Sequence, residues 1–271
     1  SIGEYVAACL AGVFDLERAL AAEVDGARLV RAVVDDGASE ARLLSTRGID
    51  CGHRHRAAML FLEVAAGEVR RSAEVAAKAA VEIDFEAQAR RLATLLTIAR
   101  DGDRASAESG PMVLAPPVAA RALAGLLPML VGGDGWRFAR SLRGRRDRVA
   151  SERVTVIDDG GLTGGLPRPG IDGQGVPIRA VRLIEAGYYR QPLLSWHEAH
   201  PGRGESSGCM LRPTWRQPPE PGPTHLYLKP DEDVSPAALV GSVRRGFYWL
   251  DCVGAGRFDL ATDRFELPVC G

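Results

Sequence analysis

The chain has 271 residues, of which 46% are hydrophobic and 25% charged, and its formal net charge is −1. This composition is that of a folded globular protein, and it excludes collagen, coiled coil and long disordered segments. A chain so nearly neutral has no basic field to hold a nucleic-acid backbone, so we expect no nucleic-acid partner. The five cysteines contain no Cys-x-x-Cys pair, which argues against a zinc ribbon or a disulfide framework and fits a reducing cytoplasm.

The sequence shows no signal peptide and no membrane span. It lacks a basic N-terminal segment followed by an apolar one, and no stretch approaches the roughly 18 apolar residues that cross a bilayer. We therefore expect a cytoplasmic protein without a membrane contact.

The first hundred residues predict two helices around a β region. Apolar residues at helical spacing predict a helix over residues 2–23, which Gly26 ends. Asp84 is placed as the N-cap of a second helix over residues 85–100. Between the helices we expect strands at 29–34, 41–45 and 51–66, separated by turns at 35–37 and 46–48.

Residues 101–110 are polar and small, which predicts a linker. A short strand at 111–115 should precede a helix that Pro117 opens and that Pro128 ends or kinks. Strands predominate after residue 150. The elements expected there are strands at 154–157, 225–228, 246–252 and 265–269, a hairpin over 176–194, and a helix over 235–245 with Ser235 as its cap.

Strands thus come in runs, with helices inserted between them, and they do not alternate with helices one by one. This order predicts an α+β fold with an antiparallel β-rich core of curved sheets and inserted helices. We divide the chain into an N-terminal α+β segment (1–100), the linker (101–110) and a C-terminal β-rich domain (111–271).

The segment 158–175 is rich in glycine, proline and aspartate, and it is longer than most connections. It is either an ordered surface loop or the lining of a subunit contact or chamber. In the second case Asp158, Asp159, Arg168 and Asp172 make the polar contacts with a partner or a substrate.

Phe247, Tyr248, Trp249 and Leu250 follow one another on a predicted strand. Tyr248 and Leu250 should share one face, and Phe247 and Trp249 the other. Both faces should then be covered, one by the core and the other by the helix over 235–245, a partner subunit or a bound peptide. Tyr248 and Trp249 are therefore candidate contacts for a partner or peptide.

Motifs for independent catalysis are weak. His197, Glu198 and His200 come near a zinc-binding pattern, but the histidines are three apart where a helical zinc site needs four, and a Pro-Gly pair follows. His53 and His55 share a strand face beside arginines, which favours a surface or groove. Two alternatives stay open: a stand-alone peptide-binding scaffold, and an enzyme that uses His197, Glu198 and His200 or a cysteine.

From Ser45 onward, segments in a fixed order resemble motifs of the TldD/PmbA family. Ser45-Thr46-Arg47-Gly48-Ile49-Asp50 resembles the family's NSRGLDV turn. The further matching segments are VTVIDD (154–159), GGLPRP (164–169), DGQGVP (172–177), LIEAG (183–187), SSG (206–208), PGPTHLYLKP (221–230) and GFYWLD (246–251).

By this resemblance the chain is a subunit of a heterodimeric metallopeptidase. One subunit type of the family carries a zinc-binding HExxxH helix after a short strand, and the PmbA/TldE type lacks it. The matching stretch here, residues 119–127, holds neither histidine nor glutamate. The resemblance implies the zinc-free PmbA/TldE-type subunit, shortened at both ends, with no catalytic residue and no metal of its own.

The implied function is to support a TldD-like zinc peptidase that processes short or unfolded peptides. Zinc, its activated water and the general base are expected in the partner subunit. This chain is expected to supply half of a chamber and a wall that holds extended peptide through backbone groups at a sheet edge. Maturation of a peptide natural product is one task that such a pair could serve.

Overall fold

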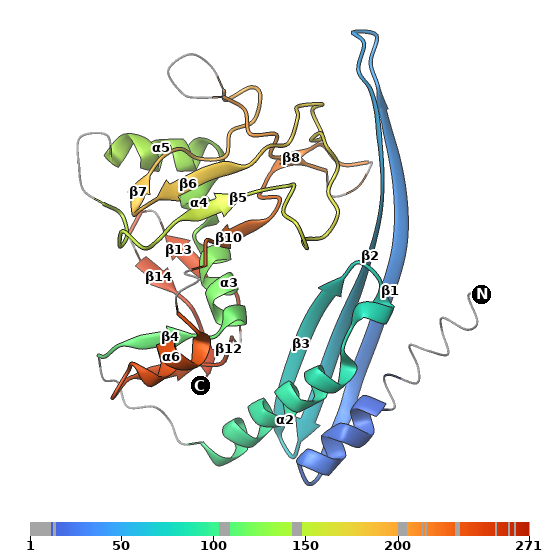
Figure 1. Cartoon of the computed structure of the whole chain (residues 1–271), viewed down its shortest axis with the longest axis vertical. Coiled ribbons are helices and arrows are strands. Elements are labelled where there is room, and N and C mark those ends of the chain that lie inside the picture. The colour runs from blue at the N-terminus through green and yellow to red at the C-terminus, as the bar shows by residue number, and fades with distance from the viewer. Residues whose placement is uncertain are drawn as a thin grey trace. The chain divides into compact units, whose positions relative to one another are not determined.

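The structure is a computed structural model of the whole chain (Figure 1). It describes residues 12, 15–102, 109–142, 148–199, 205–212, 214, 216–230, 234–252, 254–259, 261–262 and 264–270. The chain folds into two compact units. The first comprises Ser1–Glu40 and Arg54–Ser109 together with Gly271, and the second comprises Ala41–His53 and Gly110–Cys270.

The first unit contains a three-stranded sheet in the order β1-β2-β3. Its strands are β1 (Ala27–Leu44), β2 (Asp50–Ala66) and β3 (Val69–Ala77). The β1–β2 turn is at residues 46–48, as predicted, and Gly48 there has a φ of 89° that favours glycine. Because β3 pairs only with Ala58–Ala66 of β2, the remainder of the β1–β2 ribbon has two strands (Figure 1).

The predicted turn at residues 35–37 is wrong, because β1 continues through it. The carboxylate of Asp36 accepts two hydrogen bonds from Arg56 on β2, at 2.8 and 2.9 Å. It also accepts one from the backbone N–H of Ala80 at 3.1 Å. These partners satisfy a charge that would otherwise favour a turn. The sequence analysis also missed β3, whose alternation of alanine with charged residues is a weak strand signal.

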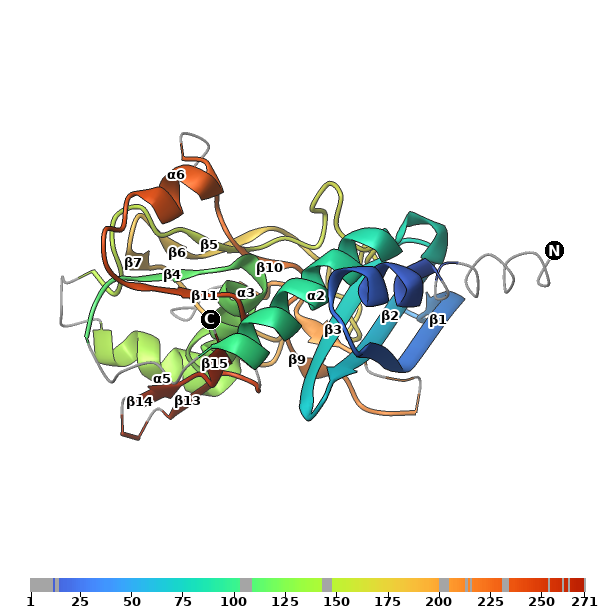
Figure 2. The same cartoon turned by 90° about the horizontal axis from the view of Figure 1, so that it is seen from below.

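Two helices cover one face of this sheet (Figure 2). Residues 15–23 are helical, and residues 1–11 of the predicted helix lie outside the described residues. α2 spans Phe85–Asp101, and the Asp84 side chain accepts a hydrogen bond from Ala87 N at 2.8 Å, so the predicted cap is confirmed. The buried core between helices and sheet includes Leu16, Leu20, Leu60, Leu62, Val64, Leu92 and Leu96.

The second unit has a four-stranded antiparallel sheet in the order β10-β5-β6-β7. Its strands are β5 (Val156–Asp158), β6 (Val181–Glu185), β7 (Tyr188–Tyr189) and β10 (Leu226–Leu228). The predicted hairpin over 176–194 is present but much shorter. Its turn uses Ala186 and Gly187 at positive φ, and a Cβ on Gly187 would lie 2.3 Å from the carbonyl oxygen of Ala150.

Three helices follow the linker region in sequence. They are α3 (Pro116–Gly125), α4 (Leu127–Leu130) and α5 (Gly132–Leu142). The prediction that Pro128 ends the first of them is confirmed, because α3 stops at Gly125 and Pro128 falls in the first turn of α4. Leu123 of α3 and Leu130 of α4 contribute to a core with strands β5 and β6, whose buried members are Leu123, Leu130, Val156, Val181, Leu183, Leu193 and Cys209.

The rest of this unit consists of strand pairs. β4 (Met112–Leu114) pairs in parallel with β11 (Phe247–Trp249), and three other pairs are antiparallel. These pairs are β8 (Met210–Leu211) with β9 (Glu220–Pro221), β12 (Asp251–Cys252) with β15 (Val269–Cys270), and β13 (Arg257–Asp259) with β14 (Arg264–Glu266). Ser235 caps α6 (Pro236–Gly241) as predicted.

The predicted α+β class is therefore confirmed, with several small sheets in place of a few long ones. The expected strands at 246–252 and 265–269 are each divided in two. Within the described residues, no helix has both the length and the apolar character needed to cross a membrane.

Candidate functional site

Asp158 closes the beginning of the long loop 158–175. It lies at the end of β5 and is buried, and its carboxylate accepts hydrogen bonds from Thr224 N at 2.8 Å and Thr224 Oγ1 at 3.1 Å. Burial raises the pKa of this carboxyl, and the hydrogen bonds from Thr224 partly oppose that rise. Asp158 therefore fixes the loop to the segment that leads into β10.

Asp159 and Arg168 hold the same two segments together from the loop side. The carboxylate of Asp159 accepts from Gly161 N at 2.9 Å, and its carbonyl oxygen accepts from His225 Nδ1 at 3.0 Å. Arg168 Nη2 donates to the carbonyl oxygen of Thr224 at 3.2 Å. Arg168 itself is exposed and Asp159 is half-buried, so both remain accessible to a partner.

Asp172 anchors the other end of the loop. It is buried, and its Oδ1 accepts from Gln174 N at 2.8 Å and Val176 N at 2.9 Å. Its Oδ2 accepts from Met210 N at 3.1 Å, which joins the loop to β8. The structure thus brings Asp158, Asp159 and Arg168 together at residues 224–225 and places Asp172 at a separate junction. A direct contact of any of them with a partner stays a prediction.

The turn at residues 195–198 has a role that the sequence analysis missed. Ser195 Oγ accepts from Glu198 N at 3.2 Å, while Glu198 Oε2 accepts from Ser195 N at 3.0 Å and from Ser195 Oγ at 2.8 Å. This is a capping box, and its Ser-x-x-Glu signal is visible in the sequence. Glu198 is engaged there, His197 packs edge-on against Trp196, and His200 lies outside the described residues. The described residues contain no group of three or more His, Cys, Asp or Glu side chains that could hold a metal.

Cys209 is a core residue with an inert thiol. It is buried, and burial raises its pKa to about 11, with the charges of Asp172 and Glu198 adding to the rise. The thiolate is the nucleophilic form, and at neutral pH this group stays protonated. The arrangement therefore supports a structural role for Cys209 and not nucleophilic catalysis.

The helix that should carry zinc ligands in the resembling family is α3, which follows β4. Its residues are PPVAARALAG, with Val118, Leu123 and Gly125 buried. A Cβ on Gly125 would lie 2.7 Å from the carbonyl carbon of Gly256, so this helix is packed tightly against neighbouring backbone. Without a carboxylate, imidazole or thiolate, α3 does not fit zinc, and we derive no metal-dependent step on this chain.

β4 and β11 form a partly exposed apolar face. The rings of Phe247 and Trp249 stack with centroids 5.4 Å apart, which confirms that these two residues share a face. Met112 and Leu114 lie opposite them in register, and Met112 is 65% exposed. α6 buries none of its residues, so it is not the cover that the sequence suggested for the strand. Cover by a partner or a peptide stays a prediction.

Tyr248 points to the other side of β11 and is 41% exposed. It pairs in register with Val113, which is buried. One side of this strand pair is thus partly closed by the core, while an aromatic ring on it remains accessible.

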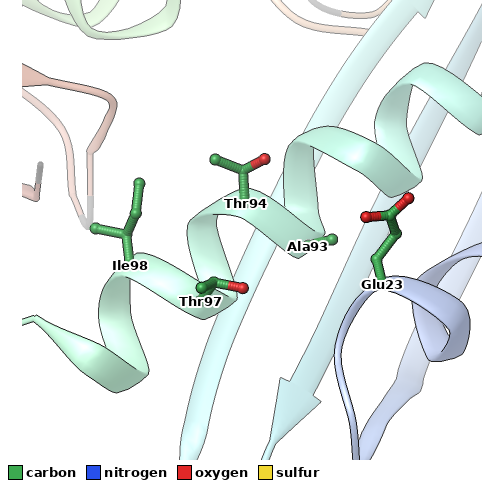
Figure 3. Close-up of a pocket in the computed structure, with 5 residues that line it drawn as sticks. All are labelled: Glu23, Ala93, Thr94, Thr97 and Ile98. Atoms are coloured by element: carbon green, nitrogen blue, oxygen red, sulfur yellow. The ribbon is translucent and has the colours of Figure 1, made fainter.

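Two pockets occur away from these residues. One in the first unit, of about 220 Å³, lies between Glu23 and the outer face of α2 (Figure 3). Its other lining residues are Ala93, Thr94, Thr97 and Ile98, and they provide hydroxyl groups but no base or second charge. The other, of about 430 Å³, lies at the edge of the four-stranded sheet and is lined by three arginines.

Comparison with known proteins gives consistent matches. Residues 107–271, more than half of the chain, match the family model described as the PmbA/TldA metallopeptidase C-terminal domain. A curated protein from Buchnera aphidicola subsp. Schizaphis graminum, named Metalloprotease TldD homolog, is 30% identical over 118 residues, which are 44% of this chain and 24% of that protein.

Solved structures resemble most of the chain. The crystal structure of TldE from Thermococcus kodakarensis matches with a TM-score of 0.81 and 21% identity, and covers 95% of this chain. A Thermotoga maritima protein named as a putative modulator of a DNA gyrase matches with a TM-score of 0.70 and 20% identity, over 89% of this chain. This chain spans only 60% and 56% of those two chains. At these identities the likeness shows the fold.

Proposed function

The chain belongs to the PmbA/TldD family, and we propose that it is a zinc-free, TldE-like subunit that pairs with a zinc-carrying, TldD-like peptidase. The observation that carries the proposal is the composition of α3. In the position where a catalytic subunit needs zinc ligands, this helix has only alanine, leucine, valine, proline, glycine and one arginine. The fold match to TldE supports the same assignment.

In the proposed pair the partner supplies zinc, which activates water for attack on a peptide bond. This chain contributes surfaces. Its four-stranded sheet ends in the short strand β7 on one side and β10 on the other, and such edges bind extended peptide through backbone groups. The pair would process short or unfolded peptides, including precursors of peptide natural products. A cytoplasmic location belongs to the proposal and is supported by the cysteine usage.

The partner contact that we propose is the apolar face of Met112, Leu114, Phe247 and Trp249, together with Tyr248. Exposed apolar side chains that cluster on one surface are typical of protein interfaces, and aromatic residues dominate their binding energy. The loop 158–175 is a second proposed contact. Asp158 and Asp172 hold its two ends, so Asp159 and Arg168 would meet the partner on a fixed frame.

Reconstitution tests the proposal. The chain alone should cleave no peptide, and the TldD-like partner should gain activity when it is added. Trp249→Ala and Tyr248→Ala should each weaken association by about 1–3 kcal/mol, as buried interface aromatics do. Phe265→Ala, which alters an exposed aromatic on β14, is the matched control and should leave association unchanged.

Equal partner activity with and without this chain would contradict the subunit role. If the chain still binds peptide in that case, it is a stand-alone scaffold. Deletion of residues 161–167 gives a second test, since it should weaken association more than it lowers the melting temperature. A sharp fall in melting temperature with unchanged association would make the loop purely structural.

A further inference from the structure

The pocket at the edge of the four-stranded sheet carries a further inference. It has a volume of about 430 Å³ and is lined by residues from β6, from the chain after β7 and from a distant segment. Its lining residues are Arg179, Ala180, Val181, Arg182, Arg190, Gln191 and Glu205. We propose that this pocket binds an acidic side chain of an extended peptide. The inference deepens the proposed function and rests on it for the ligand being a peptide.

The backbone explains why a pocket forms here. β7 ends at Tyr189, and the next backbone hydrogen bond to β6, from Arg190 N to Leu183 O at 2.8 Å, continues the ladder by one residue. β6 begins earlier, at Val181. Residues 179–182 therefore extend beyond the point where β7 stops pairing, and the pocket lies beside them. An extended peptide that enters there would lie along a sheet edge, where backbone groups can bind it.

The charges of the pocket favour an anion. Arg182 Nη1 and Arg190 Nε both contact the carboxylate of Glu185, at 2.8 and 3.1 Å, so two guanidinium groups share one acid. Arg179 pairs with Glu205. The set thus has three positive and two negative groups, and each guanidinium has five N–H donors of which these contacts use only a part. An additional carboxylate would balance the charge and use the remaining donors.

The pocket already accommodates a carboxylate from its own chain. The side chain of Glu205, 81% exposed, reaches Arg179 from a separate segment. Ion pairs this exposed contribute little stability, so an incoming acid can take the place of Glu205. Capture of a C-terminal carboxylate generally uses backbone N–H groups, whereas arginine side chains that line a pocket are typical of recognition of acidic side chains within a segment. We therefore assign the site to aspartate or glutamate inside a peptide.

Calorimetric titration of the full chain tests this site without the partner. The probe is acetyl-AAEAEAA-amide, which has no terminal charge, and the comparison peptide is acetyl-AAQAQAA-amide. We expect the acidic peptide to bind about tenfold tighter, as for one or two hydrogen bonds to charged groups. Arg182→Gln should abolish the difference, and Arg182→Lys should keep part of it. Glu205→Gln should tighten binding of the acidic peptide.

Arg264→Gln is the matched control, because Arg264 is an exposed arginine that pairs with Glu266 at 2.9 Å on β14, away from the pocket. It should change nothing. Melting curves of all variants confirm that they fold. Equal affinity for both peptides, or a preference that survives Arg182→Gln, would overturn the inference. Tighter binding of acetyl-AAQAQAA with a free C-terminus than of the acidic amide would show a C-terminal carboxylate site instead. Because no partner is present, these failures are distinct from a failure of reconstitution.

Discussion

The first unit buries almost only aliphatic side chains, whereas the second also buries polar ones. Leu60, Leu62, Leu92 and Leu96 fill the interface between helices and sheet in the first unit. Among the described residues, all five polar residues that are buried as a whole belong to the second unit, namely Asp158, Asp172, Ser195, Ser207 and Thr224. Ser207, for example, joins its segment to Leu194, donating from N at 3.1 Å and accepting from Leu194 N through Oγ at 3.2 Å.

This difference follows from the amount of regular structure. A long sheet satisfies its own backbone groups, so only apolar side chains need to be buried against it. The second unit has short strands and long loops, and the N–H groups of those loops need other acceptors. Buried carboxylates such as Asp172 provide several acceptors each. A unit built in this way can present ordered loops as surfaces, which suits the role of a binding wall.

The largest effect should come from removing such an anchor. Asp172→Ala leaves three backbone N–H groups without their acceptor in a buried site, and it should lower the free energy of unfolding by about 3–5 kcal/mol. Chemical denaturation measures the loss, and hydrogen exchange should locate it at residues 172–176 and 208–211. Asp159→Ala is the control, since its carboxylate is half-buried and accepts from Gly161 N, and it should cost less than about 1 kcal/mol. Equal costs would break the distinction between the units.

An apolar truncation in the first unit should be nearly as costly. Leu92→Ala removes a fully buried side chain from α2 and should cost about 3 kcal/mol by cavity formation. Hydrogen exchange should then increase in α2 and β2 but not at residues 208–211. The control is Val81→Ala, at an exposed position of the same unit, with an expected cost below about 0.5 kcal/mol. Exchange that increases equally in both units would show that they unfold together.

Cys209 should react only when the second unit opens. Its thiol is buried with a pKa raised to about 11, so alkylation by iodoacetamide at neutral pH should be about a hundredfold slower than in the denatured chain. Mass spectrometry of the peptide that contains Cys209 measures the rate. Asp172→Ala should accelerate the reaction, while Leu92→Ala should not. Rapid alkylation of the native protein would contradict the inert role and reopen a cysteine-based activity.

The smallest effect concerns pH. Burial raises the folded-state pKa of Asp158 above its ordinary value of 3.8, so the stability linked to its protonation is fully present below 3.8 and is lost as pH rises through the raised pKa. The wild type should therefore gain stability relative to Asp158→Asn as pH falls from neutral toward 4. Thr224→Val removes a hydrogen bond that lowers this pKa, so it should move the transition to higher pH. A difference that stays constant with pH would refute the assigned cause.

Sequence patterns located the regular elements of the first unit well. The apolar stripe and the Asp84 cap predicted α2, and the turn at residues 46–48 was found. The failure at Asp36 has a clear cause, because the partner that keeps it in a strand, Arg56, is distant in sequence. β3 was missed since its small and charged residues acquire their register only from β2.

The second unit was harder to predict because distant contacts determine it. Local sequence marks the loop 158–175 as unusual, but it does not show that Asp158 turns toward Thr224 or Asp172 toward Met210. The capping box of Ser195 and Glu198 is a local signal and could have been found. The arginine pocket could not, because Glu205 and the strands β6 and β7 are separated in the chain.

Metal stoichiometry tests the central claim most directly. Native mass spectrometry of this chain alone, of the TldD-like partner and of their mixture, each in zinc, would count ions per species. We predict no zinc on this chain, one on the partner and one per heterodimer, because α3 lacks ligands. One zinc bound tightly by this chain alone would contradict the account, and two per heterodimer would do so as well.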